Sequence, residues 1–383
     1  MTARPAALSL LVGNFVVGVC VLGPTGMLNQ LAPDLGVSIA EAGLLVTCGA
    51  VVLCLGSPLV SWLTSRLDRR LLLTGSLLLV ALGQLASAFA PSFAALLVIR
   101  VVGVAAAAPY TPQAASTIAL LVPEKERARA IAFVFLGWSL SVAAGLPLVT
   151  LVTAHLGWRA GFAAIAGAAL LGAALLAVRL PAGLRGAAVS IASWIAIARH
   201  RQIRLLLVLT AVQVAGQFAI FTYLGALLVI LAGAGSATIG ACFAIFGVTG
   251  FAGNVIATRV VTGLGALRTT LIFMCSILAG VMLWSFGAGA ILVMAAGLAV
   301  WGLGFAAVNS MQQARLVAAR PDLAAGSVAL NTSSIYVGQA VGSAVGGFLL
   351  ARALPLAIGH AAIGFVIAAL ILLLFTRGPG ERL

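Results

Sequence analysis

Long apolar runs follow one another along the whole chain, and short groups of polar, charged, proline or glycine residues separate them. Each run holds about 20 residues, the length that a helix needs to cross a bilayer core of ~30 Å. The strands of a membrane β-barrel would instead alternate apolar and polar residues in segments of about ten. The pattern therefore predicts an all-α polytopic membrane protein.

Twelve of these runs are expected to be transmembrane helices. They cover residues 8–31, 42–64, 71–89, 93–120, 129–153, 159–178, 204–231, 237–258, 268–287, 290–314, 325–350 and 357–376. The one long interruption, 179–204, falls between the sixth and the seventh run. We therefore expect an N-terminal six-helix bundle (1–180), a cytoplasmic linker (181–203) and a C-terminal six-helix bundle (204–383). Within the linker, Trp194 lies in a segment that is typical of a short interfacial helix.

The two halves of the sequence repeat each other weakly. Residues 56–66 resemble residues 253–263, and Gly145 corresponds to Gly342, both 197 positions later. Pro123 corresponds to Pro321, 198 positions later. Three agreeing offsets close to half the chain length indicate that the chain is built from duplicated halves. The predicted fold is therefore two pseudo-symmetric bundles of six helices.

The composition agrees with a membrane protein and explains the basic charge. Of the 383 residues, 63% are hydrophobic and 7% are charged, with a mean hydropathy of +1.23. A soluble domain carries roughly 25% charged residues. The net charge of +14 does not indicate nucleic acid as a partner, because cytoplasmic loops of membrane proteins collect Lys and Arg. If the N-terminus is cytoplasmic, every Lys and Arg except Arg100, Arg159 and Arg352 falls on the cytoplasmic side, so both termini are expected there.

Other classes of protein find little support in the sequence. The run after Arg4 is expected to remain as an uncleaved first helix, because no convincing cleavage site follows it. The five cysteines lie inside apolar runs without metal-ligand spacing, so buried small residues are expected rather than a metal site. No nucleophile–base pair or Walker-type loop occurs. We therefore expect no enzyme, no cofactor and no ATP-driven pump.

One charged segment interrupts the apolar runs at Ser65–Arg70, where "SRLDRR" places four charged side chains in six residues. With the residues before it, "GSPLVSWLTSRLDRR" stands where the major facilitator superfamily carries its loop 2–3 signature, G-x-L-a-D-R-x-G-R-R. "IRVVGVAAAAPYTP" carries the fourth-span arginine of that family as Arg100, and "GLPLVT" from Gly145 resembles its fifth-span antiporter element. Nearly the whole chain resembles this superfamily. "GWRAGF", "GQFAIFTYL" and "GPTGML" are similar to its twelve-span bacterial drug and sugar efflux branch, whose members resemble drug:proton antiporters.

This resemblance implies a secondary active or facilitative transporter of the bacterial inner membrane that works by alternating access. The same resemblance implies a monomer whose partners are a small-molecule substrate and the lipid bilayer. It also implies a cytoplasmic gate, whose basic side chains meet carboxylates and helix C-termini across the seam and hold the outward-open state. The alternative is that these arginines only fix the topology. The gate residues are Ser65, Arg66, Asp68, Arg69 and Arg70. Ser65 replaces the Asp of the signature and cannot form its ion pair, while Asp68 occupies the usual place of Gly.

The substrate site is expected mid-membrane between the halves, on the first and fourth spans of each half and on the eleventh span. Gln213 and Gln217 are four residues apart, so they share a helix face and can present two amides to one ligand. The alternative for each polar residue is an interhelical hydrogen bond. For Arg100, the alternatives are an anchor for an anionic substrate and a structural guanidinium that binds carbonyls of a neighbouring broken helix. The candidates are Arg100, Tyr110, Gln113, Gln213, Gln217, Tyr223, Asn309, Gln312, Tyr336 and Gln339.

Prolines and glycines inside the runs mark candidate hinges. Proline removes a backbone donor and kinks a helix, and small residues let helices approach closely. Hinges of alternating access and simple packing bends are both compatible with these positions. The residues are Pro24, Pro109, Pro112, Gly145, Pro147, Gly342 and Gly346.

No acidic residue falls inside a predicted span, and the histidines map to the outer face or the central loop. Proton-driven transport needs a group in the membrane that gains and loses a proton. We therefore expect export that is weakly coupled or uncoupled to protons, or coupled through a proton on the substrate. Amides, tyrosines, apolar walls and one arginine suit a neutral or weakly anionic amphiphile, such as a drug or a sugar-like compound. A lipid flippase or scramblase on the same fold is the alternative.

Overall fold

A computed structural model of the protein describes residues 3–64, 67–123, 126–185 and 191–377. The first group of helices is α1 (Ala3–Asp34), α2 (Ile39–Ala42), α3 (Leu44–Leu63), α4 (Arg69–Ala88), α5 (Phe93–Ala105), α6 (Tyr110–Leu121), α7 (Arg127–Leu140), the π-helical turn η2 (Ser141–Gly145) and α8 (Leu146–Arg179). After α9 (Ile191–Arg199), the second group is α10 (Arg201–Phe221), α11 (Leu224–Ala232), α12 (Ser236–Phe286), α13 (Ile291–Ala319), the 3-10 turn η3 (Pro321–Leu323), α14 (Ala324–Ala351) and α15 (Pro355–Phe375). No strand occurs among the described residues.

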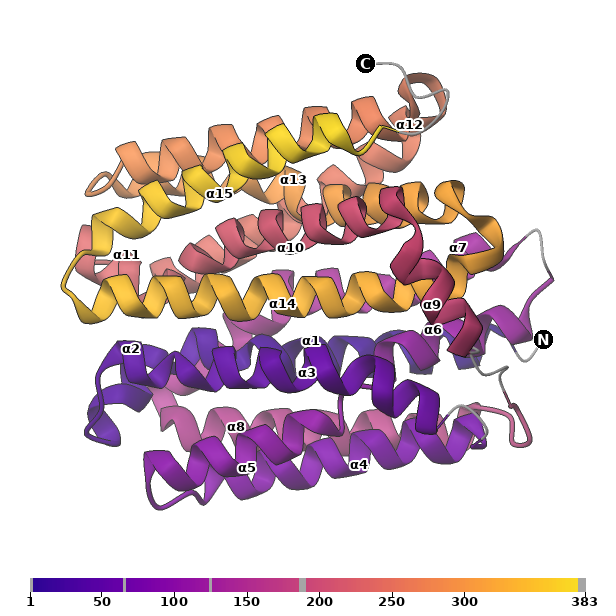
Figure 1. The fold of residues 1–383 in the computed structure, drawn as a ribbon. Helices are drawn as coiled ribbons and strands as arrows, with labels where there is room; N and C mark the ends of the chain where they lie inside the picture. The colour runs from indigo at the N-terminus through magenta and orange to yellow at the C-terminus, as the bar shows by residue number, and fades with distance from the viewer. Residues whose placement is uncertain (1–2, 65–66, 124–125, 186–190, 378–383) are drawn as a thin grey trace.

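The two groups of helices form two bundles that lie against each other. In Figure 1, α1 to α5 and α8 occupy the lower part of the view, α10 to α15 occupy the upper part, and α7 reaches up to the level of α10. The start of α1, the end of α15 and α9 lie toward the right-hand side of the view, at the end that we call the termini end. The opposite end carries α2 and α11, and we call it the α2–α11 end. The helices run between these two ends, as the predicted all-α membrane fold requires.

The described helices account for twelve membrane crossings. Ten helical stretches in this part of the chain are long and apolar enough to cross a membrane. Two of them, Ala130–Arg179 and Ser236–Phe286, hold 50 and 51 residues. At about 1.5 Å per residue, each is more than twice as long as the ~30 Å core, so each contains two crossings. Ten stretches with two double ones give the twelve crossings that the sequence predicted.

Each double stretch turns at a glycine with positive φ, which other residues rarely adopt. These are Gly157 (φ 81°) in α8 and Gly265 (φ 79°) in α12. Both fall in the gaps between predicted spans. The residues after Gly157 also fix the end of α1: Trp158 Nε1 and Arg159 Nη1 donate to Asp34 Oδ2 over 2.6 and 2.7 Å. The "GWRAGF" segment therefore joins the turn inside α8 to the first helix.

Prolines interrupt the fourth and fifth crossings. The fourth crossing breaks between α5 and α6: α6 begins after Pro109, and Pro112 lies in its first turn, where a missing N–H is tolerated. In the fifth crossing, Pro147 has no N–H to donate to Ala143 O. The backbone widens there into η2, so that Leu146 N donates to Ser141 O. Both breaks occur where the sequence placed kinks.

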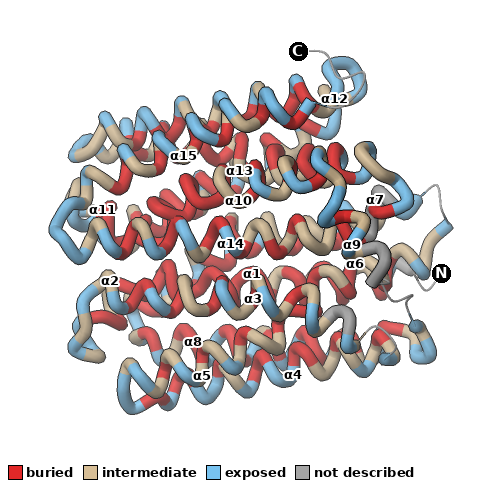
Figure 2. Tube along the Cα trace, in the orientation of Figure 1, coloured by how far each residue is buried: buried red, intermediate tan, exposed pale blue. Residues whose placement is uncertain are grey.

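The first helix of each bundle lies at the centre of the molecule. In the most apolar stretch of α1, 78% of the residues are buried, and in that of α10, 67% are. The other membrane-spanning stretches are 33–44% buried. Figure 2 shows exposed residues along the outer helices, and they include large apolar side chains such as Leu171 and Leu292. Such side chains are normal where lipid rather than water is the solvent.

Glycines bring central helices into close contact. Gly338, Gly342 and Gly346 recur every fourth residue on α14, and a Cβ at any of them would overlap a backbone carbonyl oxygen of α10. The carbonyls belong to Ala211, Ala215 and Ala219, which have the same spacing. In the N-terminal bundle, a Cβ at Gly145 would likewise overlap Val19 of α1. Small residues at this spacing are typical of tight helix packing in membranes.

Candidate functional site

Most of the predicted cavity residues are buried in this conformation. Of the ten, only Asn309 is partly exposed. They lie on α5, α6, α10, α13 and α14, except Tyr223, which lies between α10 and α11. The structure divides them into separate groups at different depths, and several of them bind buried polar partners. The contacts of each group show what it can do.

Arg100 on α5 binds the backbone of α1 in the turn before Pro24. Its Nη2 donates to Cys20 O over 2.6 Å and to Val21 O over 3.0 Å. Pro24 has no N–H, so the helix itself cannot satisfy Cys20 O four residues earlier. The guanidinium replaces that missing donor. This geometry corresponds to the structural interpretation of Arg100.

A thiol and an amide complete the surroundings of Arg100. Gln84 Nε2 donates to Cys20 Sγ over 2.8 Å, and Arg100 Nη1 lies 4.0 Å from the same sulfur. Arg100 Nε and Gln84 Oε1 have no hydrogen-bond partner. The carboxylates of the described residues lie elsewhere, at helix ends or between helices: Asp34, Glu41, Asp68, Glu126 and Asp322. Asp34 is the last residue of the first membrane-spanning stretch, and Glu41 lies in the first turn of the second.

An amide chain links α10 and α13 in the C-terminal bundle. Trp301 Nε1 donates to Gln217 Oε1 over 2.8 Å, and Gln217 Nε2 donates to Gln213 Oε1 over 2.6 Å. Gln213 Nε2 donates to Asn309 Oδ1, and Asn309 Nδ2 donates to Phe305 O, both over 3.3 Å. Gln213 and Gln217 share a face, as the sequence predicted, and they bind each other. We call these four side chains the amide chain: Trp301, Gln217, Gln213 and Asn309.

Aromatic rings surround the buried part of the amide chain. Phe221 stacks on Phe305 with 6.0 Å between ring centroids and an interplanar angle of 21°. The other pairs have centroid distances of 4.9–6.5 Å and mostly meet edge to face, which is favourable for aromatic groups. Phe305 is the partly exposed member of the group. The aromatic cluster consists of Phe218, Phe221, Phe243, Phe246, Trp301 and Phe305.

Tyr223 lies at the contact between the bundles near the α2–α11 end. Its Oη donates to Ser343 O of α14 over 3.1 Å. Its ring lies against Gly346 and Gly347 of the same helix, and also against Gly43 of the N-terminal bundle. A Cβ at Gly43 would overlap the phenol oxygen. Tyr223 therefore fills the space between the bundles at this end, rather than an open cavity.

The remaining tyrosines and Gln339 have fewer polar contacts. Tyr110 is fully buried against Gly13 of α1, and its hydroxyl has no hydrogen-bond partner. Tyr336 and Gln339 lie three residues apart on α14, so they share a face. Gln339 Nε2 also has no partner. Both groups are therefore buried without a polar partner in this conformation.

The charged segment after the second crossing contacts the start of the linker. Asp68 is the N-cap of α4, because its Oδ1 accepts hydrogen bonds from the backbone N of Arg70 and Leu71 over 2.9 and 3.1 Å. Its Oδ2 accepts a hydrogen bond from the backbone N of Gly183 in the linker. Partial burial alone would raise the pKa of Asp68. The three backbone donors outweigh this effect and lower the pKa below its usual value, so the carboxylate is ionised at neutral pH.

Arg69 is buried beside the same linker. Its Nη1 donates to Gln113 Oε1 of α6, and its backbone N donates to Leu184 O over 2.9 Å. The described part of the predicted gate therefore joins α4, α6 and the linker. Ser65 and Arg66 lie outside the described residues.

The C-terminal bundle has a comparable buried arginine at the termini end. Arg315 Nη2 donates to the carbonyl and the hydroxyl oxygen of Thr376, each over 2.9 Å. Arg315 Nη1 donates to Gln312 Oε1 over 3.4 Å. Gln312 Nε2 has no partner. The predicted cavity residues Gln113 and Gln312 thus each bind a buried arginine.

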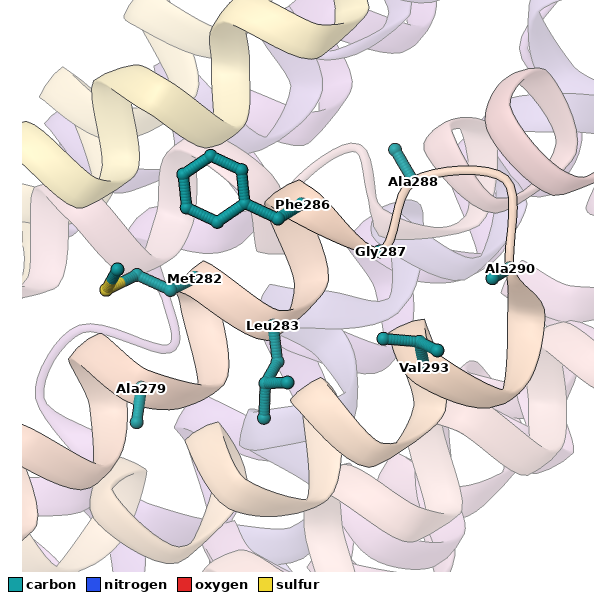
Figure 3. A pocket seen from close by; sticks show the side chains of 8 residues that line it. All are labelled: Ala279, Met282, Leu283, Phe286, Gly287, Ala288, Ala290 and Val293. Carbon is teal, nitrogen blue, oxygen red and sulfur yellow. The ribbon is translucent and has the colours of Figure 1, made fainter.

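An open pocket at the α2–α11 end does not have the character of a substrate site. Figure 3 shows it between the end of α12 and the start of α13. Its lining consists of Ala279, Met282, Leu283, Phe286, Gly287, Ala288, Ala290 and Val293. Ligand sites combine an apolar lining with a few placed polar side chains. This pocket has the apolar lining, including the exposed Phe286 and Leu283, but no such polar side chain.

The family model of the Major Facilitator Superfamily matches residues 10–330, which span both bundles. The chain belongs to the major facilitator superfamily. It is a multi-pass membrane transporter, and the resemblance found in the sequence is confirmed.

Relatives and solved structures agree over nearly the whole chain. The inner membrane transport protein YdhP of Escherichia coli O157:H7 is 29% identical over 96% of this chain and 94% of its own. A chloramphenicol efflux pump of Mycobacterium tuberculosis is 27% identical over 87% of this chain and 83% of its own. The crystal structure of the human organic anion transporter MFSD10 superposes with a TM-score of 0.75, at 18% identity, over 97% of this chain and 100% of that one. This superposition supports the twelve-helix fold.

The sequence analysis missed the partners that organise the C-terminal candidates. Trp301 and Phe305 precede Asn309 by eight and four residues, so all three lie on one face of α13. That spacing was visible in the sequence. The contact of Trp301 with Gln217 was not, because the two residues are 84 positions apart and belong to different helices.

Proposed function

We propose that this transporter exports small neutral or weakly anionic amphiphiles by alternating access across a bacterial inner membrane, with both termini in the cytoplasm. The observation that carries this proposal is the chemistry at the centre of the molecule. Buried amides and aromatic rings lie there, whereas the described carboxylates lie at helix ends or between helices. A permanent cation would lose its hydration without gaining an anionic partner. A neutral compound with an aromatic ring and polar groups loses much less.

The relatives support export and suggest a ligand. One is named a chloramphenicol efflux pump, and another is named an inner membrane transport protein. Chloramphenicol is a neutral aromatic amide, which fits the polar and apolar groups described above. The distribution of Lys and Arg supports a cytoplasmic location of the termini end.

Flux in proteoliposomes tests the proposal. Purified protein is reconstituted, and saturable exchange of radiolabelled chloramphenicol is compared with that of tetraphenylphosphonium, a lipophilic cation. We expect exchange of chloramphenicol to be at least about 10-fold faster, because an uncompensated charge costs several kcal/mol to bury. Faster exchange of the cation would contradict the proposal. Transbilayer movement of a fluorescent phospholipid without chloramphenicol exchange would instead support a lipid transporter.

A further inference from the structure

The amide chain has a direction that its first member sets. The indole N–H of Trp301 can donate a hydrogen bond but cannot accept one. Gln217 must therefore turn its oxygen toward Trp301, which is the orientation in the structure, with 2.8 Å between Nε1 and Oε1. The usual ambiguity between amide oxygen and nitrogen does not arise here, because the reversed amide would place two donors against each other.

This direction passes along the chain to Asn309. With its oxygen held by Trp301, Gln217 can offer only its Nε2 to Gln213, and Gln213 then offers its own Nε2 to Asn309. Asn309 accepts through Oδ1, so its nitrogen is the terminal donor. That nitrogen uses one N–H on the backbone oxygen of Phe305, over 3.3 Å. An amide nitrogen has two N–H groups, so one remains for another acceptor.

The terminal donor lies where a ligand can reach it. Gln217 is fully buried and Gln213 is 1% exposed, whereas Asn309 is partly exposed. Phe305, one turn before Asn309 on α13, is also partly exposed and belongs to the aromatic cluster. A hydrogen-bond donor and an apolar ring face thus lie side by side at the accessible end of a buried, fixed network.

We propose that Asn309 Nδ2 and the ring of Phe305 form a subsite for a neutral aromatic ligand that carries a hydrogen-bond acceptor, such as a nitro or carbonyl group. The acceptor binds the free N–H of Asn309, and the ligand ring packs on Phe305. Trp301 is a positioning residue, because it keeps Asn309 in the donor orientation without touching the ligand. The proposal rests on the proposed function and specifies the kind of ligand.

The subsite discriminates between acceptors and donors. A ligand with an amine in place of a nitro group brings N–H against N–H and leaves a buried polar group unpaired. The expected penalty for such a mismatch is on the order of 10- to 100-fold in affinity. A ligand that differs only in this group therefore reports directly on the direction of the amide chain.

Direct binding to the purified full-length protein tests the subsite. The probes are chloramphenicol and its derivative with the nitro group reduced to an amine, titrated by calorimetry. We expect the nitro compound to bind at least about 10-fold more tightly to the wild type. Trp301→Phe frees the amides to reverse, so the ratio of the two affinities is expected to fall below about 3. Trp138→Phe removes an indole N–H bond in the other bundle, to Thr111 Oγ1, and is expected to leave the ratio unchanged.

Two further results complete the test. Asn309→Asp replaces the terminal donor by an acceptor and is expected to favour the amine, and it gives an independent answer if Trp301→Phe does not fold. Equal affinities in the wild type, or an unchanged ratio in both variants, would overturn the subsite while leaving export of neutral amphiphiles intact. If neither compound binds and neither is exchanged in proteoliposomes, the proposed function itself fails.

Discussion

Arg100 is the membrane-embedded charge that the sequence could not assign to a role, and its contacts depend on one proline. Pro24 leaves Cys20 O without a donor inside α1, and the Arg100 guanidinium binds that oxygen over 2.6 Å. A charged donor on a buried carbonyl is stronger than a neutral one. The hydrogen bond between Arg100 and Cys20 O therefore satisfies the carbonyl that Pro24 leaves free and also holds α5 against α1.

A double-mutant cycle measures this dependence. In Pro24→Ala, the restored backbone N–H can satisfy Cys20 O, so Arg100→Ala should destabilise the protein less in that background, by about 1–3 kcal/mol. The measurement is unfolding of the purified protein in detergent. Pro33→Ala, which also restores a donor in α1 but away from Arg100, is the control and should not change the cost of Arg100→Ala. An equal cost in all backgrounds would mean that the kink and the guanidinium act independently.

At the scale of helices, the contact between the bundles at the α2–α11 end depends on residues without side chains. Gly43, Gly346 and Gly347 surround the Tyr223 ring, and a Cβ at Gly43 would overlap its hydroxyl. This close packing joins the two bundles, so a separation of the bundles at this end removes it. A small increase in volume at Gly43 therefore disfavours one conformation of the transport cycle rather than the fold as a whole.

Gly43→Ala should shift the population toward a state in which this end is open. Overpacking typically costs about 1–3 kcal/mol, which corresponds to a shift of roughly 5- to 150-fold. The readout is labelling by a hydrophilic thiol reagent of Ser343→Cys, a buried position beside Tyr223, in a cysteine-free background. Gly75→Ala is the control, because a Cβ there meets no atom within 4 Å. Adding Tyr223→Ala should reverse the effect of Gly43→Ala, because it removes the ring that the new Cβ would overlap. Labelling that rises equally in Gly43→Ala and Gly75→Ala would contradict the predicted shift.

The number of helices and the breaks within them were predictable, because apolar runs and single prolines determine these features. Apolar runs fixed the twelve crossings, and Pro109 and Pro147 marked breaks that occur as expected. The partners of buried polar groups were not predictable, because they depend on which helices meet and at what depth. Gln213 and Gln217 illustrate both cases: their spacing showed a shared face, but only the fold shows that Trp301 occupies it.

For the whole molecule, the positions of the acids decide how transport can be driven. Asp34 lies at the end of α1 and binds Trp158 and Arg159, and Asp68 caps α4 outside the spans. The lowered pKa of Asp68 keeps this carboxylate deprotonated at neutral pH, so it does not take up a proton there. Neither residue is placed to carry a proton between the two sides of the membrane.

We therefore predict that a pH gradient drives little accumulation of a non-titrating substrate in proteoliposomes. The measurement is exchange of a neutral compound with and without an imposed gradient of about two pH units, for the wild type, Asp34→Asn and Asp68→Asn. The three proteins should respond to the gradient equally weakly, because both carboxylates lie at the ends of membrane-spanning helices rather than within them. Strong gradient-driven accumulation that either substitution abolishes would show that one of these carboxylates couples transport to protons.

The pairing of Arg100 with Cys20 O also constrains how the protein is made. The two residues are 80 positions apart, and at a synthesis rate of about 5–20 residues per second the ribosome needs about 4–16 s to pass from one to the other. During that time the kinked first helix has an unsatisfied carbonyl, and it is also the helix that the finished fold covers most completely, with 78% of its most apolar stretch buried. The carbonyl that Pro24 leaves free therefore gains its protein donor only after the fourth crossing has been made.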